Sequence, residues 1–413
     1  MRWGKGKGKG KGKGKGKGNS KGKAVVAAVL GVLVLLAGCS GSGADTAAGA
    51  DPGVSSSAPA PTGVSPPRIP SSRDLPGGPH AVGFASDGSG FALLARCGKT
   101  RCRQYVAVLD KGADSWRLAR SPLADVRGDL GISAGLVVLG PGRALITEGT
   151  WPPPDGTWFT GDGGRSWRHG SDAPSGTTAA VPEGGALIHD CSRPDKEGNG
   201  CESSRLLAVL PGTGRFQALA NQPPLAGVVT PAGETADGRL FASGAHPGSG
   251  APALAVSEDR GRTWRTALIA PTEEQGWGMR VVASGAVLYA LHPGQLPEEE
   301  GVKNGLLALH RSTDGGRTWE QVWQYRKGVD PRSSIGDPVA AVDGSLTIHG
   351  EDAVWRSTDG GRSFEEVRGS QGLGGSATVT PLGYVMGGSF GSGSYRISAD
   401  GVHWHSFGLG DGT

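Results

Sequence analysis

The chain has 413 residues, of which 36% are hydrophobic and 75 are glycine, and its formal net charge at pH 7 is +4. Ten of its 42 lysines and arginines lie in the first 23 residues, where none of the 38 acidic residues occurs. Without this leader, 32 basic residues face 38 acidic ones, a net charge of −6. Such a balance argues against nucleic-acid binding, which depends on neutralising phosphates with basic side chains.

Residues 1–38 have the pattern of a secretory signal peptide, with a Lys-Gly-rich basic stretch followed by the apolar run Ala24–Gly38. This run is shorter than the ~20 residues that a membrane-spanning helix needs. It ends in Leu36-Ala37-Gly38-Cys39, which resembles the bacterial lipobox, whose cysteine becomes the lipid-bearing first residue. The resemblance implies a lipid anchor at Cys39 on the extracytoplasmic face of the cell membrane. A buried core cysteine is the alternative.

Residues 39–79 follow as a lipidated tether. They are rich in Gly, Ser, Ala and Pro and contain few large apolar side chains. Such a segment cannot bury enough surface to offset the entropy of folding, so we expect it to be disordered. The folded domain is expected to occupy residues 80–413.

Four cysteines remain after Cys39, in two pairs of short spacing. They are Cys97 and Cys102, and Cys191 and Cys201. In an oxidising compartment this spacing predicts two local disulfides. A metal site is the competing interpretation, but neither pair is a Cys-x-x-Cys motif and no histidine stands at ligand spacing beside them.

From His80 onward the chain consists of short strand-like runs separated by turn residues, without helical periodicity. In one unit the runs and turns follow each other as Val339–Val342, Asp343-Gly344, Ser345–Ile348, Ala353–Arg356, Asp359-Gly360-Gly361 and Ser363–Val367. Asp-Gly between apolar runs predicts a tight hairpin, because glycine adopts the positive φ that the turn requires. Each unit is therefore expected to contain four antiparallel strands.

One phrase, Ser/Thr-x-Asp-x-Gly-x-Ser/Thr-Trp or a close variant, recurs five times. Its aspartates and aromatic residues are Asp162 and Trp167, Asp259 and Trp264, Asp314 and Trp319, Asp359 and Phe364, and, in a shortened copy, Asp400 and Trp404. Degenerate copies at 109–116 and 210–216 complete a series of seven units, approximately 80–119, 132–168, 180–217, 229–265, 281–320, 338–365 and 376–407. This period predicts an all-β, seven-bladed β-propeller. Six or eight blades are the alternatives.

The phrase resembles the Asp-box, or BNR repeat, of sialidases, sortilin-type receptors and other secreted propellers. The resemblance implies that each box forms the turn between the third and fourth strands of a blade. Its aspartate would accept backbone N–H bonds and its aromatic ring would pack under the turn. The ten aspartates and aromatic residues above are therefore expected to be structural rather than catalytic.

In an up-and-down blade, the loops between the second and third strands share one face with the links between blades. The long, irregular loops of this chain fall there, so we expect ligands to bind at this face. Its candidate residues are Trp151, Asp155, Glu273, Glu274, Trp277 and Tyr325. Packing within the blades is the alternative role for the aromatic ones.

Calcium is the one cofactor that a local pattern suggests. Asp195, Glu197 and Asn199 alternate ahead of Gly200, as at the start of a calcium loop. Leu206 stands where the closing acid should be. We therefore expect no bound metal or cofactor.

A sialidase-like exo-glycosidase is the enzymatic hypothesis. Arg68-Ile69-Pro70 is similar to the sialidase phrase whose arginine holds the substrate carboxylate, although Pro67 replaces the aromatic residue. Arg96 ends a run similar to the strand that leads to the acid/base aspartate, yet no acid occurs between Arg96 and Asp110. No catalytic residue can be assigned, and Arg68 and Arg96 are the only candidates.

Non-catalytic binding needs none of these missing residues. We therefore expect a monomeric, membrane-anchored lipoprotein whose propeller binds an envelope glycan or a protein partner. A third hypothesis is an assembly or scaffold factor for a membrane complex.

Overall fold

The computed structural model describes residues 64–412 except 129–131, 133, 150–155, 172, 197–199, 273–275, 297–300, 370–374 and 389–391. The predicted signal peptide, Cys39 and most of the predicted tether lie outside the described residues. Within the described part no helix is long and apolar enough to cross a membrane.

Seven sheets form a β-propeller, which confirms the predicted fold and the count of seven blades. Six of the seven sheets have four strands each, and the first has a fifth strand, β5, paired with β3. The predicted units match the sheets within a few residues.

The strands of the first four blades, in chain order, are β1 (Gly78–Phe84), β2 (Gly90–Cys97), β3 (Arg101–Leu109), β4 (Arg117–Ala119) and β5 (Val126–Arg127); β6 (Gly135–Gly140), β7 (Arg143–Glu148), β8 (Gly156–Thr160) and β9 (Arg168–Gly170); β10 (Thr177–Thr178), β11 (Ala186–Pro194), β12 (Cys201–Val209) and β13 (Phe216–Leu219); β14 (Ala226–Glu234), β15 (Leu240–Ala245), β16 (Pro252–Ser257) and β17 (Arg265–Leu268). Those of the last three are β18 (Arg280–Ser284), β19 (Val287–Gly294), β20 (Gly305–Ser312) and β21 (Glu320–Gln324); β22 (Val339–Ala340), β23 (Leu346–His349), β24 (Val354–Ser357) and β25 (Glu365–Glu366); β26 (Ala377–Thr380), β27 (Gly383–Gly387), β28 (Ser394–Ser398) and β29 (His405–Gly408).

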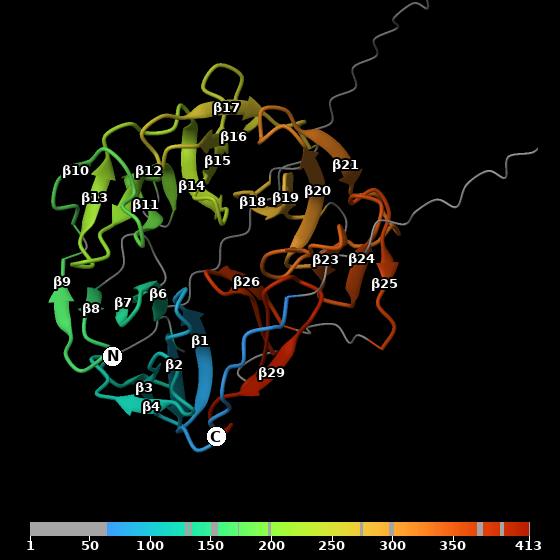
Figure 1. The fold of residues 1–413 in the computed structure, drawn as a ribbon. Coiled ribbons are helices and arrows are strands. Elements are labelled where there is room, and N and C mark those ends of the chain that lie inside the picture. Colours follow the sequence, from blue (N-terminus) through green and yellow to red (C-terminus); the bar gives the residue numbers. More distant parts are fainter. Residues whose placement is uncertain are drawn as a thin grey trace, which may run out of the picture. The chain divides into compact units, whose positions relative to one another are not determined.

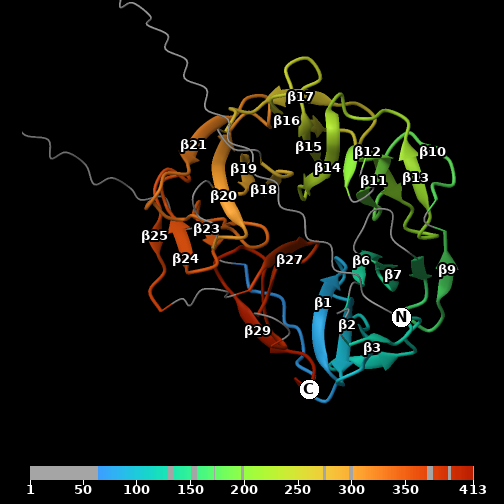
Figure 2. The ribbon, with the colours of Figure 1, turned by 180° about the vertical axis from the view of Figure 1, so that it is seen from behind.

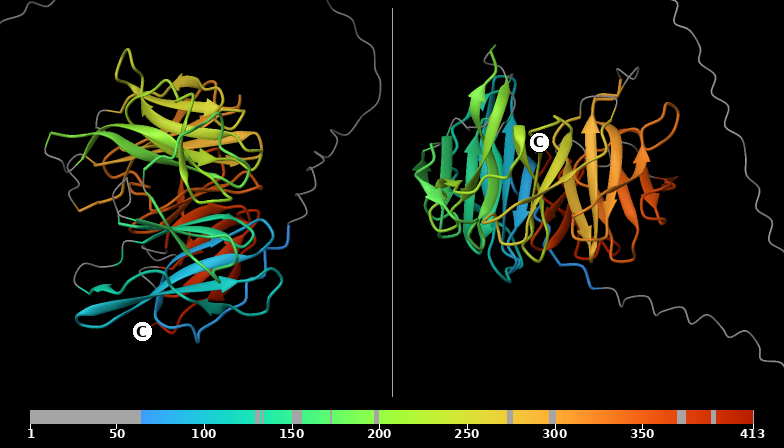
Figure 3. Two further views of the ribbon diagram at one scale, coloured as in Figure 1. Left: turned by 90° about the vertical axis from the view of Figure 1, so that its left-hand side faces the viewer. Right: turned by 90° about the horizontal axis from the view of Figure 1, so that it is seen from above.

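The blades are arranged in a ring. First strands such as β1, β6 and β18 lie toward its middle, and last strands such as β9, β17 and β25 lie at its rim (Figures 1 and 2). In the view from above, the strands run between two opposite faces of the ring (Figure 3). Because neighbouring strands are antiparallel, the turns after strands one and three lie on one face, and the loops after strand two lie on the other.

Blade three departs from the pattern of the other six. Its first strand, β10, pairs in parallel with the last strand, β13, at one edge of the sheet, while β11 forms the other edge. A turn at 182–185 separates β10 from β11. In this turn the Gly185 amide donates to the Pro182 carbonyl at 2.9 Å. Three antiparallel strands and one short parallel strand therefore make up this blade.

The Asp-box turns have the geometry that the resemblance implies. Asp162 accepts bonds from the amide and the hydroxyl of Ser166, at 2.9 Å and 2.5 Å, and from the Thr160 hydroxyl at 2.9 Å. These bonds lower the pKa of its carboxyl to about 2. Gly164 has a φ of 75°, and a side chain there would approach Val108 and Ala119 of blade one. The box therefore both closes its own turn and fits closely against the neighbouring blade.

The aromatic residue of every unit packs against the preceding blade. Trp167 of blade two meets Phe91 of blade one edge to face, with ring centroids 6.5 Å apart. The full set, which includes both degenerate copies, is Trp116, Trp167, Phe216, Trp264, Trp319, Phe364 and Trp404. The hydrophobic core is thus divided among the seven interfaces, and each box aromatic contributes to one of them.

The chain ahead of β1 closes the ring. The Ser72 amide donates to the Gly408 carbonyl at 2.7 Å, so the segment forms a parallel bridge with the end of β29. Ile69 and Leu75 are buried between blades seven and one. This part of the segment, which the sequence assigned to the tether, therefore belongs to the propeller.

Candidate functional site

The two predicted disulfides are present at the face that carries the loops after second strands. Cys97–Cys102 joins the end of β2 to the start of β3, and Cys191–Cys201 joins β11 to β12. Both cross-links fix hairpins at this face, which we call the loop face. The boxes lie on the opposite face.

Trp277 is the aromatic side chain that the described loop face presents most openly. Its exposed fraction is 49%, and it is the one aromatic residue among the exposed large apolar residues of the described chain. Its backbone is held in place, because its amide donates to the Pro293 carbonyl at 2.7 Å and Gly276 forms a bridge with Gly294. A fixed backbone with an exposed indole is suited to stacking on a sugar or anchoring a protein.

The other predicted loop-face residues are distributed differently. Tyr325 is half-buried and packs against the core shared by blades five and six. Its amide also donates to the Leu307 carbonyl at 2.9 Å. Trp151, Asp155, Glu273 and Glu274 lie outside the described residues.

The two arginines of the enzymatic hypothesis differ in their contacts. Arg68 is exposed and has no hydrogen bond or ion pair with any described residue. Arg96 forms an ion pair with Asp411 near the C-terminus. The motif around Arg68 serves ring closure, since Ile69 is buried and the Pro70 carbonyl accepts a bond from the Trp116 indole at 2.9 Å.

Three buried histidines were missed by sequence reasoning. His292, His310 and His349 are at most 3% exposed, and burial lowers the pKa of each to about 4. Both ring nitrogens of His310 lack a hydrogen-bond partner among the described residues. The rings are neutral at pH 7. Those of His292 and His310 are enclosed by the sheets, whereas His349 borders a hollow between blades six and seven. Each directly follows a leucine or isoleucine of a strand, and this apolar neighbour was the available signal of burial.

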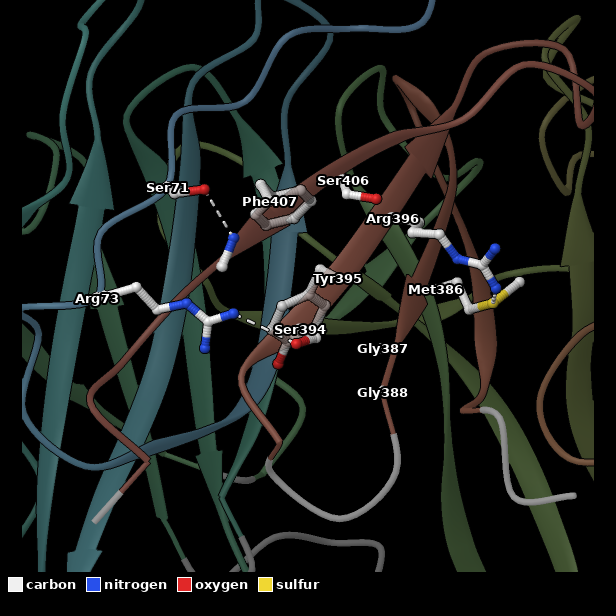
Figure 4. Close-up of a pocket in the computed structure, with 11 residues that line it drawn as sticks. Ser71, Arg73, Met386, Gly387, Gly388, Ser394, Tyr395, Arg396, Ser406 and Phe407 are labelled. Atoms are coloured by element: carbon white, nitrogen blue, oxygen red, sulfur yellow. Dashed lines mark hydrogen bonds between the residues drawn. The ribbon is translucent and has the colours of Figure 1, made fainter. Parts of the chain in front are cut away.

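A crevice along blade seven was also missed by sequence reasoning. It consists of two adjoining hollows of about 490 Å³ each, which share Met386 and Arg396. Arg73, Ser394 and Ser406 line the first hollow, where Arg73 reaches toward Ser394 from the N-terminal segment (Figure 4). The second hollow lies between blades six and seven and is lined by residues that include His349, Arg356, Arg368 and Trp404. We call the two together the arginine crevice.

No group of three His, Cys, Asp or Glu side chains able to hold a metal ion occurs among the described residues. In the calcium-like segment, residues 197–199 are outside the described part, and Leu206 is fully buried on β12. The calcium pattern therefore stays a prediction from sequence.

No protein-family model and no curated protein sequence matches the chain. Among solved structures it is similar to YCF48 from Cyanidioschyzon merolae, with a TM-score of 0.44 and 13% identity, over 79% of this chain and 94% of that one. It is also similar to Kuenenia stuttgartiensis hydrazine synthase, with a TM-score of 0.41 and 15% identity, over 81% and 96% of the two chains. It is similar as well to the Hadza microbial sialidase Hz136, with a TM-score of 0.36 and 14% identity, over 81% of this chain and 66% of that one. These likenesses concern the fold and carry no argument about activity.

Proposed function

We propose that the protein is a lipid-anchored, extracytoplasmic binding module whose propeller holds an envelope glycan or a protein partner at its loop face without transforming it. The leader and Cys39 support the anchor, because a basic segment, an apolar run and a lipobox-like end follow one another there. The two disulfides are consistent with an oxidising compartment.

The observation that carries the binding function is Trp277. Leaving an indole half exposed on a rigid backbone costs solvation free energy unless a ligand covers it, and aromatic anchors of this kind dominate binding energies at many interfaces. On the same face, the hairpins of blades one and three are held by disulfides, so those parts of the surface are preorganised and a ligand that reaches them would lose little entropy in ordering them.

The test is sedimentation of the purified full-length protein with cell-wall polysaccharide sacculi. Trp277→Ala should lower the bound fraction at least fivefold, because the indole supplies the anchor. Val342→Ala removes a similarly exposed apolar side chain from the turn after β22, on the box face, and serves as the matched control. Equal loss in both variants, or no loss in Trp277→Ala, contradicts binding at this face.

Two further measurements separate this proposal from the alternatives. Turnover of fluorogenic glycosides, including a sialoside, by the full-length protein would establish the glycosidase hypothesis instead. Release of a bound envelope component by free sugar distinguishes a glycan ligand from a protein partner in an assembled membrane complex.

A further inference from the structure

The interface between blades six and seven has the smallest apolar cluster of the seven that the described residues form. Its buried members are Val339, Ala377 and Tyr384, with Trp404 packed against them. Each of the other six clusters contains at least six buried residues. The Tyr384 hydroxyl donates to the Ala340 carbonyl at 3.0 Å and ties the second strand of blade seven, β27, to the first strand of blade six, β22. The remaining space between the sheets forms the second hollow of the arginine crevice.

Among the described residues, four arginines and one histidine line the two hollows, and no acidic residue does. This local excess of positive charge contrasts with the net charge of −6 that the chain has without its leader. Arg356 is partly neutralised, because it forms an ion pair with Asp343 at 2.7 Å and stands opposite Glu365 on β25. The positive charge available to a ligand therefore comes from the other three arginines.

Arg396 occupies the junction of the two hollows and has no carboxylate partner among the described residues. Its guanidinium lies 3.1 Å from the Met386 sulfur and 5.8 Å from the centre of the Trp404 ring. A thioether is a weak acceptor, so most of the five donors of this guanidinium remain available. After burial, the charge of Arg396 is the second cause that lowers the pKa of His349.

Arg368 extends the same charge toward the loop face. It is exposed on the turn that follows β25, and the described residues offer it no hydrogen-bond or ion-pair partner. Arg73, on the other side, donates one long bond of 3.3 Å, to the Ser394 hydroxyl, and no other bond to a described residue. Three planar guanidiniums along one crevice match the geometry of carboxylates and phosphates, which arginine binds in a bidentate manner.

We propose that the arginine crevice is a second binding site, which takes an anionic glycan chain bearing carboxylate or phosphate groups. Arg396 and Arg368 hold the anionic groups, the serine hydroxyls of the first hollow bond to sugar hydroxyls, and the exposed edge of Trp404 contacts a sugar ring. The site is separate from Trp277, so it does not depend on the function proposed for the loop face. Through this site the anchored propeller binds a charged polymer of the envelope.

The test measures binding of three probes to the full-length protein by calorimetry at low salt. The probes are an oligogalacturonate, a glycerol-phosphate oligomer and a neutral malto-oligosaccharide of the same length. We expect binding of at least one anionic probe, and the stronger of the two identifies the anionic group. Arg396→Gln and Arg368→Gln should each weaken it about tenfold, and Arg396→Lys, which keeps the charge but loses the planar fork, should weaken it less than Arg396→Gln.

Arg317→Gln is the matched control, since Arg317 is an equally exposed box arginine of blade five, outside the crevice. It should change the affinity less than twofold. Equal loss in Arg317→Gln, equal binding of the neutral probe, or no binding of either anionic probe would overturn the proposal. Because Arg368 lies on an exposed turn, its substitution tests the site without disturbing the fold.

Discussion

The Trp116 indole of the first blade donates a 2.9 Å hydrogen bond to the Pro70 carbonyl of the segment that precedes the propeller. Trp116 is the aromatic residue of a degenerate box, and it packs among the side chains of blade seven. The same residue type that joins each blade to the preceding one thus also fastens the N-terminal segment where the ring closes.

Truncation of this closing residue should be costly. Trp116→Ala is expected to lower the free energy of unfolding by about 3–5 kcal/mol, because it leaves a cavity between blades seven and one. Trp116→Phe keeps most of the packing and should cost less. Urea denaturation measures both, and Leu118→Ala, on an exposed neighbour, is the control. A loss below 1 kcal/mol in Trp116→Ala would contradict a role for the Trp116 indole in closing the propeller.

The box aspartates should stabilise their turns. Asp162→Ala removes the acceptor of bonds from Ser166 and Thr160, and the exposed position limits the expected cost to about 1–2 kcal/mol. Asp114→Ala, on an exposed acid without a described partner, controls for the change in charge. Thermal unfolding of the two variants compares them directly, and equal midpoints would exclude a stabilising role for the box carboxylate.

Stability should fall as the pH drops from about 6.5 to about 4. His292, His310 and His349 have folded-state pKa values of about 4, below their ordinary value of 6.5. In that window the unfolded chain binds more protons than the folded chain, so acid favours unfolding. Denaturation at pH 7, 5.5 and 4.5 measures this slope.

His310→Leu should flatten that pH dependence. The leucine removes a ring whose nitrogens have no described partner and replaces it with a side chain of similar size, so stability at pH 7 should be kept or raised. His169→Leu, at an exposed position on β9, is the control. An unchanged slope in His310→Leu would assign the acid sensitivity to other groups.

Removal of the Cys191–Cys201 disulfide should destabilise the third blade while the ring persists. A cross-link over this separation is worth about 2–3 kcal/mol by restricting the unfolded chain. The double substitution Cys191→Ser, Cys201→Ser measures this cost by urea denaturation, with the Cys97, Cys102 pair treated in the same way as a comparison. Equal free energies of unfolding for the oxidised and substituted proteins would contradict a stabilising role for the Cys191–Cys201 disulfide.

Much of the architecture could be predicted because its signals are local. In a box, the aspartate, the serine or threonine hydroxyl and the glycines act within a few residues of one another, so a single phrase specifies the turn. The disulfides join cysteines five and ten residues apart across one hairpin. Seven such units predicted seven blades without any knowledge of long-range contacts.

Most of the candidate site could not be predicted in this way. Trp277 was predicted from its loop, but its exposure depends on how Gly276 and the Trp277 amide are held against the end of β19. Arg396 could not be distinguished from the other arginines, because its lack of a carboxylate partner depends on what blade six places opposite it. Arg68 and Arg96 looked alike in sequence, yet the fold pairs only one of them with Asp411.

The sequence by itself determined the repeat, the box turns and the disulfide-bonded hairpins, since these rest on bonds between residues close together in the chain. Only the tertiary structure decided how the ring closes, since Ser72 bonds to Gly408, which is 336 positions later in the chain. It also decided which interface stays open and which arginines stay unpaired. Both depend on the packing of whole sheets against each other, a long-range balance of apolar contact and charge that no local pattern encodes.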